Sequence, residues 1–233
     1  MPPWLEIDEE LAAKVKNLVA EALLSTPAPS PAVALEVTRQ ILQLADRIIE
    51  EFETVNTLPY PLACRVGCTS CCHNQVQVTP PEAFLLASML RTYTSPEKQR
   101  TVQERVARLA AQNRRQDPAR IAARRGANPC PLLLGERCAL YPWRPLMCRA
   151  MHAFDADKCR SSMARGDLAT DACYLHRYVF AFSLSTGLME GFRSVGCLPA
   201  TLELAQALEV ALGDPDALSR WLRGKEVFRA QGG

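Results

Sequence analysis

Apolar residues recur at helical spacing in two stretches near the start of the chain. The first contains Leu11, Val15, Leu18 and Ala22, and the second contains Val37, Ile41, Leu44, Ile48 and Phe52. Asp8 precedes the first stretch and is followed by two glutamates, which is typical of a helix N-cap and first turn. Ser30 with Pro31 is a second N-cap pattern, because proline is favoured at the first helical position. The pattern therefore predicts two consecutive helices.

Similar signals predict further helices along the chain. Thr79-Pro80-Pro81-Glu82 is a capping-box pattern, and Ser95-Pro96 is another start signal, with Val102, Val106 and Leu109 expected to face inward. We expect three later helices: a largely buried one over Leu168 to Thr186 that ends before Gly187, one after Thr201 that ends at Gly213, and a last one from Asp214-Pro215.

Residues 127–165 show neither the helical nor the strand period. They are rich in proline, cysteine and arginine, and we expect an irregular loop with short turns. A structureless segment of this length is unusual inside a domain unless something else holds it, and a metal ion is a natural tie. We also find no alternating strand pairs and no glycine-rich phosphate loop. We therefore predict a mainly α fold, with helices around an irregular, cysteine-rich core.

Composition places the chain among ordinary globular proteins. It has 233 residues, 48% of them hydrophobic, and a formal net charge of +2. We expect one domain overall, made of a helical arm (1–55), a cysteine-cluster core (56–165) and C-terminal helices (166–233). No apolar run is long enough to span a membrane. The first residues show no secretory pattern, so we expect the cytoplasm.

The charges are unevenly distributed along the chain. Residues 1–54 are acidic, and residues 97–125 are basic, with eight arginines and Lys98. A basic stretch from Arg100 to Arg125 could contact phosphates, but it has no interleaved aromatic residues and no nucleic-acid motif. We therefore favour solvated helix faces, and we expect neither nucleic acid nor a membrane as a partner. A protein partner or substrate is left unidentified.

Ten cysteines are the unusual feature of the composition. In a reducing compartment, clustered thiols are more often metal ligands or redox groups than disulfides. Segment 64–73, CRVGCTSCCH, holds four of them, and Gly67 permits a positive φ between two ligands. Thiolates suit zinc, iron–sulfur clusters and Cu(I). Adjacent side chains diverge, so Cys71 and Cys72 fit either two centres, or one ligand and one buried thiol, better than a single tetrahedral centre.

A second group of cysteines lies in the irregular segment. Its members are Cys130, Cys138, Cys148 and Cys159. Pro131 follows the first of them, as in the Cys-Pro step that ends bacterial ferredoxin runs. The two groups together supply either two four-thiolate sites or one site with reserve thiols, and the count does not choose between these arrangements.

The remaining thiols and the histidines give weaker signals. We expect Cys173, on the predicted long helix, and Cys197 to be inert thiols of the core. His73 adjoins the first group, while His152 and His176 each follow a cysteine at helical spacing. For each histidine an ordinary hydrogen-bonded role is favoured over metal ligation.

Three other classes of protein fit the cysteine pattern less well. Radical S-adenosylmethionine enzymes share the first spacing, but they use a β/α barrel and an aromatic residue where this chain has Ser70. A disulfide framework is disfavoured by the expected compartment. A zinc ribbon has two Cys-x2-Cys knuckles, whereas this chain has one, from Cys68 to Cys71.

Two ordered blocks resemble the CxxCxxCC cysteine-cluster family (the YkgJ family), which is described as a zinc- or iron-chelating domain. The blocks are Cys64-x3-Cys68-x2-Cys71-Cys72-His73 and the run Cys130-Pro131, Cys138-Ala139-Leu140-Tyr141, Arg144-Pro145 and Cys148-Arg149. The first spacing is one residue longer than the family's name implies. The resemblance implies eight metal-binding cysteines, namely Cys64, Cys68, Cys71, Cys72, Cys130, Cys138, Cys148 and Cys159.

The family is also similar to the cysteine-bearing part of flagellin lysine N-methylases. No S-adenosylmethionine-binding motif is found here, so that activity is not carried over. Arg144 and Arg149 have two readings: guanidinium groups that offset the charge of several thiolates, or surface residues. The hydroxyl of Tyr141 could donate to sulfur in the same way.

Two functional hypotheses follow. The slightly favoured one is a protein that holds an iron–sulfur cluster or iron through cysteine thiolates, with a redox or enzyme-accessory role. The alternative is a structural zinc-binding scaffold without catalysis. The sequence assigns no catalytic residue, reaction or substrate, and leaves open whether the protein is an enzyme.

Overall fold

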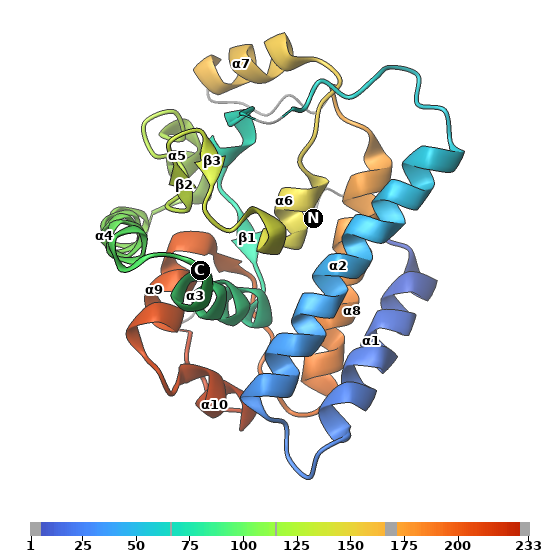
Figure 1. Cartoon of the computed structure of the whole chain (residues 1–233), viewed down its shortest axis with the longest axis vertical. Coiled ribbons are helices and arrows are strands. Elements are labelled where there is room, and N and C mark those ends of the chain that lie inside the picture. The colour runs from blue at the N-terminus through green and yellow to red at the C-terminus, as the bar shows by residue number, and fades with distance from the viewer. Residues whose placement is uncertain (1–5, 66, 115, 166–171, 229–233) are drawn as a thin grey trace.

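The computed structural model describes residues 6–65, 67–114, 116–165 and 172–228, which form the helical assembly of Figure 1. The predicted mainly α class is confirmed. The α-helices are α1 (Glu9–Leu24), α2 (Pro31–Val55), α3 (Pro80–Tyr93), α4 (Pro96–Asn113), α5 (Pro118–Ala123), α6 (Leu146–Ala150), α7 (Ala156–Arg165), α8 (Leu175–Ser194), α9 (Leu204–Gly213) and α10 (Ala217–Leu222). Two 3-10 helices, η1 (Ser70–His73) and η2 (Tyr141–Trp143), lie between them.

The predicted helix starts are confirmed by their caps. The Asp8 carboxylate accepts a 2.9 Å hydrogen bond from the backbone N–H of Leu11 at the start of α1. Ser30 caps α2 with Pro31 in the first turn. At α3 the Glu82 carboxylate accepts hydrogen bonds from both the N–H and the hydroxyl of Thr79, which completes the capping box.

Helices α1, α2 and α8 lie side by side along one edge of the molecule (Figure 1). The buried face of α1 consists of Ala12, Val15, Val19 and Leu23. The expected face of this helix was therefore partly wrong, since Leu18 is 42% exposed. The face of α1 that packs against α8 is shifted by about one residue from the face that the apolar periodicity predicts.

Helix α8 continues through Gly187 to Ser194, so the expected end before Gly187 is wrong. The expected start at Leu168 lies outside the described residues. A Cβ atom on Gly187 would lie 2.4 Å from the carbonyl oxygen of Ala12, and one on Gly191 would lie 2.5 Å from Cβ of Val19. These glycines therefore allow close helix packing, which offsets their weak helix propensity.

The other half of the core is built on α3, which is buried along most of its length against α2 and α9. Helix α4 lies on the opposite side of α9, with the three predicted apolar residues buried. Glu82 of α3 also accepts a 2.8 Å hydrogen bond from the backbone N–H of Leu146. This contact ties the start of α6, the helix that carries Cys148, to the centre of the fold.

Four two-residue strands form two antiparallel pairs in the described part of the chain. Strand β1 (Gln77–Val78) pairs with β4 (Leu202–Glu203), and β2 (Leu133–Leu134) pairs with β3 (Arg137–Cys138). The β2–β3 hairpin turns at Gly135, whose φ is +63°. The sequence analysis found no strand pairs, because two residues are too few for alternation to be visible.

The expectation of an irregular loop over residues 127–165 is wrong in part. This segment contains the β2–β3 hairpin, η2, α6 and α7. Asp155 caps α7, because its carboxylate accepts hydrogen bonds from the backbone N–H groups of Asp157 (2.9 Å) and Lys158 (3.0 Å). Elements this short do not repeat an apolar period often enough to be recognised.

Among the described residues, every helix is too short or too polar to traverse a lipid bilayer.

Candidate metal centre

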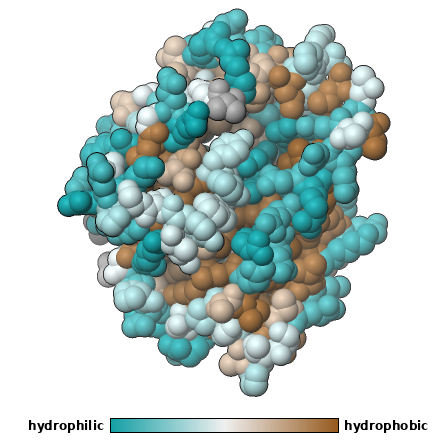
Figure 2. Space-filling view, viewed as in Figure 1, coloured by the Kyte–Doolittle hydropathy of each residue, from teal (hydrophilic) through white to brown (hydrophobic). Residues whose placement is uncertain are grey.

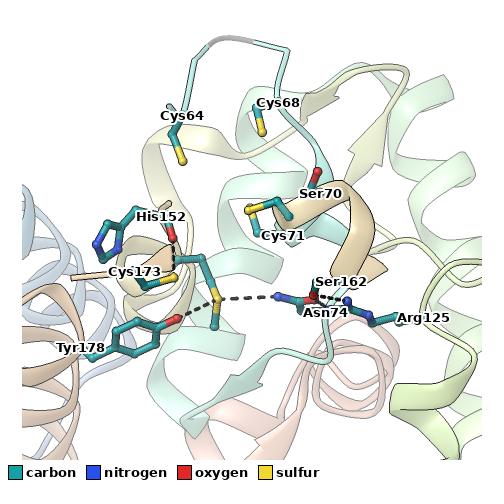
Figure 3. Close-up of a pocket in the computed structure, with 12 residues that line it drawn as sticks. Cys64, Cys68, Ser70, Cys71, Asn74, Arg125, His152, Ser162, Cys173 and Tyr178 are labelled. Atoms are coloured by element: carbon teal, nitrogen blue, oxygen red, sulfur yellow. Dashed lines mark hydrogen bonds between the residues drawn. The ribbon is translucent and has the colours of Figure 1, made fainter. Parts of the chain in front are cut away.

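The first cysteine segment is a loop that ends in the turn η1. Its start is fixed by a 2.8 Å hydrogen bond from the Ala63 N–H to the carbonyl of Ala153. Gly67 has the positive φ that the sequence predicted, +88°, and the Cys68 N–H donates to the carbonyl of Arg65. The chain therefore doubles back between the first two cysteines, which brings Cys64 and Cys68 to one side of the loop (Figure 3).

Five cysteines from three parts of the chain line one pocket (Figure 3). Cys64, Cys68 and Cys71 come from the loop, Cys159 comes from α7, and Cys173 lies just before α8. The other lining residues are Ser70, Asn74, Arg125, Met151, His152, Ser162 and Tyr178. The expectation that Cys173 lies on the long helix is wrong, because that helix begins two residues later.

The pocket is small and rich in sulfur. Its volume is about 70 Å³, whereas pockets for small organic ligands are roughly 300–1,000 Å³. None of the ten cysteines, all of which are described, is in a disulfide. The space and the donors therefore suit an ion or a small inorganic cluster better than an organic molecule.

The wall opposite the loop is held by Arg125, which is only 5% exposed. Its guanidinium contacts the side-chain oxygen of Asn74 through Nη1 and donates a 2.9 Å hydrogen bond to Ser162 through Nη2. Asn74 in turn donates to the sulfur of Met151, as does the Tyr178 hydroxyl. From the sequence, Arg125 was expected on a solvated helix face, because the surrounding run of charged residues gives no sign that one of them is buried.

Two more arginines of the basic stretch are engaged within the fold. Arg105 donates to the carbonyl of Leu133 in β2, and Arg114 forms a 2.7 Å ion pair with Glu209 of α9. These contacts hold the second cysteine block and α9 against α4. Part of the positive charge of residues 97–125 is therefore engaged in contacts within the protein.

Three cysteines of the second block are partly buried and do not line this pocket. Cys130, Cys138 and Cys148 pack against the hydrophobic core. Burial raises the pKa of Cys130 to about 12, and it raises the pKa of Cys148 well above its ordinary value. The charges of Cys130, Cys71 and Cys138 raise the pKa of Cys148 further, which indicates that these sulfurs are neighbours.

Backbone N–H groups are directed at thiols on both sides of the site. The Ala153 N–H donates to Sγ of Cys64 over 3.2 Å. Burial raises the pKa of Cys64 and Cys138, while N–H donation from Ala153 to the first and from Leu140 to the second acts in the opposite direction. Such donors stabilise thiolate and are found around metal-bound sulfur.

The adjacent pair Cys71 and Cys72 connects the two sets of thiols. Their side chains share a hydrogen bond, and this bond, followed by burial, raises the pKa of Cys71 far above its ordinary value. Cys71 lines the pocket, whereas the carbonyl of Cys72 accepts a 2.7 Å hydrogen bond from the N–H of Cys130. The pair therefore stands between the pocket and the second block.

The histidines have ordinary hydrogen-bonded roles, as expected. Nε2 of His152 accepts a 2.8 Å hydrogen bond from the Tyr174 N–H, so Nδ1 carries the proton and donates to the Ala150 carbonyl. Burial lowers the pKa of His152 to about 4. His73 contacts the carbonyl of Arg125, and His176 pairs with Glu53 at 2.8 Å.

Arg144 and Arg149 both bind Asp46 of α2. Arg149 is 1% exposed, so the surface reading is wrong for it, but its guanidinium pairs with the carboxylate of Asp46 at 2.9 Å instead of a thiolate. Arg144 pairs with the same carboxylate at 3.1 Å, and its charge partly opposes the rise in the pKa of Cys71 and Cys138. Only Arg144 therefore acts on the thiols as the sequence suggested. Tyr141 lies under its guanidinium, with 4.3 Å to the ring centroid.

In the described part of the chain, no three side chains of histidine, cysteine, aspartate or glutamate are arranged as a ready-made metal site. The thiols surround the pocket without being drawn together at its centre. Cys197 is separate from both sets and 2% exposed in the hydrophobic core, as expected.

The fold and the site together define a helical cysteine-cluster protein. Residues 63–173 match the model of the CxxCxxCC family, whose description is "putative zinc- or iron-chelating domain". The match begins one residue before Cys64 and ends at Cys173. No curated protein and no solved structure matches the chain.

Proposed function

We propose that this protein binds iron through cysteine thiolates, as an iron–sulfur cluster or as iron ions. The observation that carries the proposal is that five cysteines line one small pocket. They come from the loop, from α7 and from the segment just before α8. Thiol side chains supply the soft, anionic donors that iron–sulfur clusters require. The predicted ligands are the eight cysteines of the two blocks.

The charge around the thiols supports this proposal. A centre with several thiolates carries net negative charge, which a nearby cation offsets. Arg144 acts on Cys71 and Cys138 in this way. Backbone N–H groups that donate to sulfur are among the factors that set the reduction potential of a cluster. A bound cluster would supply one-electron transfer, which fits a redox or enzyme-accessory role.

Metal binding would draw the thiols inward from the positions that they now occupy. Cys64 and Cys68 lie on a loop, and Cys159 lies on the ten-residue helix α7. The energy required is available, because structural zinc contributes about 10–16 kcal/mol in small peptides. We therefore expect the metal to order the loop and α7 relative to each other.

The second candidate is a structural zinc site in a binding scaffold. This candidate is favoured because the thiols come from many separate segments of the chain. They lie on the loop, in the β2–β3 region, on α6, on α7 and just before α8. A metal in this place would tie these segments together, which is the usual task of structural zinc.

Anaerobic purification of the full chain distinguishes the two candidates. We expect brown protein with visible absorption that contains iron and acid-labile sulfide. Colourless protein with stoichiometric zinc would overturn the iron proposal in favour of the scaffold. Protein that takes up neither metal after reduction and reconstitution would overturn both.

A further inference from the structure

The cysteines divide in space differently from how they divide along the sequence. Of the second block, Cys159 lines the pocket with the loop cysteines, while Cys130, Cys138 and Cys148 do not line it and pack, partly buried, against the hydrophobic core. Cys173, which belongs to neither sequence block, also lines the pocket. Apart from the Cys71–Cys72 pair, four cysteines line the pocket, namely Cys64, Cys68, Cys159 and Cys173.

The geometry points to two metal centres: an outer one held by Cys64, Cys68, Cys159 and Cys173, and an inner one held by Cys130, Cys138, Cys148 and one thiol of the Cys71–Cys72 pair. This inference rests on the proposed function and goes beyond it, because it fixes the number of centres and adds Cys173 as a ligand. Four thiolates are the usual complement of a zinc or iron–sulfur site.

The position of Cys173 supports its role in the outer centre. Its thiol lies 2.8 Å from the carbonyl oxygen of His152, and its neighbour in the pocket is the Tyr178 hydroxyl. His152 itself uses both ring nitrogens in hydrogen bonds to the backbone of Ala150 and Tyr174. The imidazole thus links the backbone at Ala150 to the backbone at Tyr174. This contact holds Cys173, the residue before Tyr174, in the lining of the pocket.

The inner centre is supported by separate contacts. Cys130 is held next to Cys72 by the 2.7 Å backbone hydrogen bond, and the β2–β3 hairpin returns the chain to Cys138 directly afterwards. The carboxylate of Glu82 fixes the start of α6, which carries Cys148. The β2–β3 hairpin and α6 thus position Cys138 and Cys148, and neither residue lines the outer pocket.

The adjacent cysteines of η1 fit this division. The Cys71 and Cys72 side chains are hydrogen-bonded to each other, so both thiols lie at the boundary between the two sets. Cys71 lines the outer pocket, while the backbone carbonyl of Cys72 accepts the hydrogen bond from the N–H of Cys130 in the inner set. The pair therefore forms the partition between the centres and leaves one thiol to complete the inner set.

Metal analysis of single and double variants tests this inference on the full chain, purified anaerobically. Cys173→Ser represents the outer centre and Cys138→Ser the inner one. We expect each to retain part of the wild-type metal, with losses that add up to the whole in the double variant. Serine keeps a hydroxyl that can donate to the His152 carbonyl, so the local hydrogen bond is preserved at position 173. Circular dichroism reports whether each variant is folded.

Cys197→Ser is the matched control, because Cys197 is a buried thiol outside both sets, and it should retain all of the metal. If Cys173→Ser keeps the wild-type amount, Cys173 is not a ligand and the inference fails. If each single variant loses all metal while staying folded, there is one centre and the inference also fails. Cys159→Ser gives a second test of the outer centre, with the same loss expected as for Cys173→Ser. Wild-type protein without any metal would instead refute the proposed function.

Discussion

The guanidinium of Arg125 donates a 2.9 Å hydrogen bond to the hydroxyl of Ser162 on α7. Through its other terminal nitrogen it contacts Asn74, which directly follows η1. One buried side chain therefore joins the helix that carries Cys159 to the turn that carries Cys71 and Cys72. The spacing between these two parts of the site depends on it.

Replacement of this arginine should loosen α7. We expect Arg125→Met to lower the free energy of unfolding by about 2–3 kcal/mol, because Asn74 and Ser162 lose a charged hydrogen-bond donor in a buried place. Limited proteolysis should cut α7 faster than in the wild type. Arg120→Met, on the exposed side of α5, is the control and should leave both readouts unchanged. Equal cleavage of the two variants would contradict a bracing role for Arg125.

Removal of the metal should destabilise the protein. A ligand present at 1,000 times its dissociation constant contributes about 4 kcal/mol to stability. At this chain length that corresponds to a fall in Tm of about 8–16 °C after chelation. Differential scanning calorimetry before and after chelator treatment measures the change. Hydrogen exchange should localise it to the loop and to α7, and a uniform change across α1 and α8 would speak against a local tie.

The close packing of α1 on α8 can be tested at Gly187. Alanine there would place Cβ 2.4 Å from the carbonyl oxygen of Ala12, so the helices must separate. We expect Gly187→Ala to cost about 1–3 kcal/mol of unfolding free energy in urea titrations. Gly213→Ala is the comparison, since no atom lies within 4 Å of its added Cβ, and it should change stability by less than about 0.5 kcal/mol. Similar values for the two variants would show that the contact is not tight.

Glu53 should make stability depend on pH. Burial tends to raise its pKa, but hydrogen bonds from Arg177 and His176 outweigh it, and the pKa of Glu53 lies below its usual value. The unfolded carboxyl is therefore protonated first as the pH falls. The stabilisation is complete at neutral pH and disappears as the pH falls through the folded pKa, which lies below the ordinary range of a glutamate.

We accordingly expect Glu53→Gln to lose about 1–2 kcal/mol of unfolding free energy at pH 7. The deficit should shrink as the pH is lowered towards about 4. Glu51→Gln, at an exposed neighbouring position, should show no such trend. A deficit for Glu53→Gln that is constant with pH would mean that its ion pair is not the cause.

The helix starts could be predicted from the sequence because their signals are local. Ser30 with Pro31, and Thr79 with Glu82, satisfy backbone N–H groups within the same turn, so neighbours in sequence contain the whole interaction. The end of α8 could not be predicted in this way. Gly187 reads as a stop signal on its own, and the contact with Ala12 that explains it is a long-range one.

The candidate site shows the same limit. The cysteine segment, the second block and the turn at Gly67 are visible in the sequence, because short spacings mark them. The place of Cys173 at the pocket is not visible, since it depends on where α8 begins. Arg125 is hidden within a run of arginines whose other members include the exposed Arg120. Burial of one charged residue in such a run is decided by tertiary packing alone.

Cys64 and Cys68 are the exposed members of the cluster, at the mouth of the pocket. If the proposed outer metal is lost in air, these two thiols are the first to meet oxidant; a sulfenic acid there would remove one ligand, and a disulfide would remove both. Reloading would then require a thiol reductant as well as metal. With the proposed centre, we therefore expect an oxygen-sensitive protein whose damage is reversible at the sulfenic acid and disulfide stages and permanent once sulfinic acid has formed.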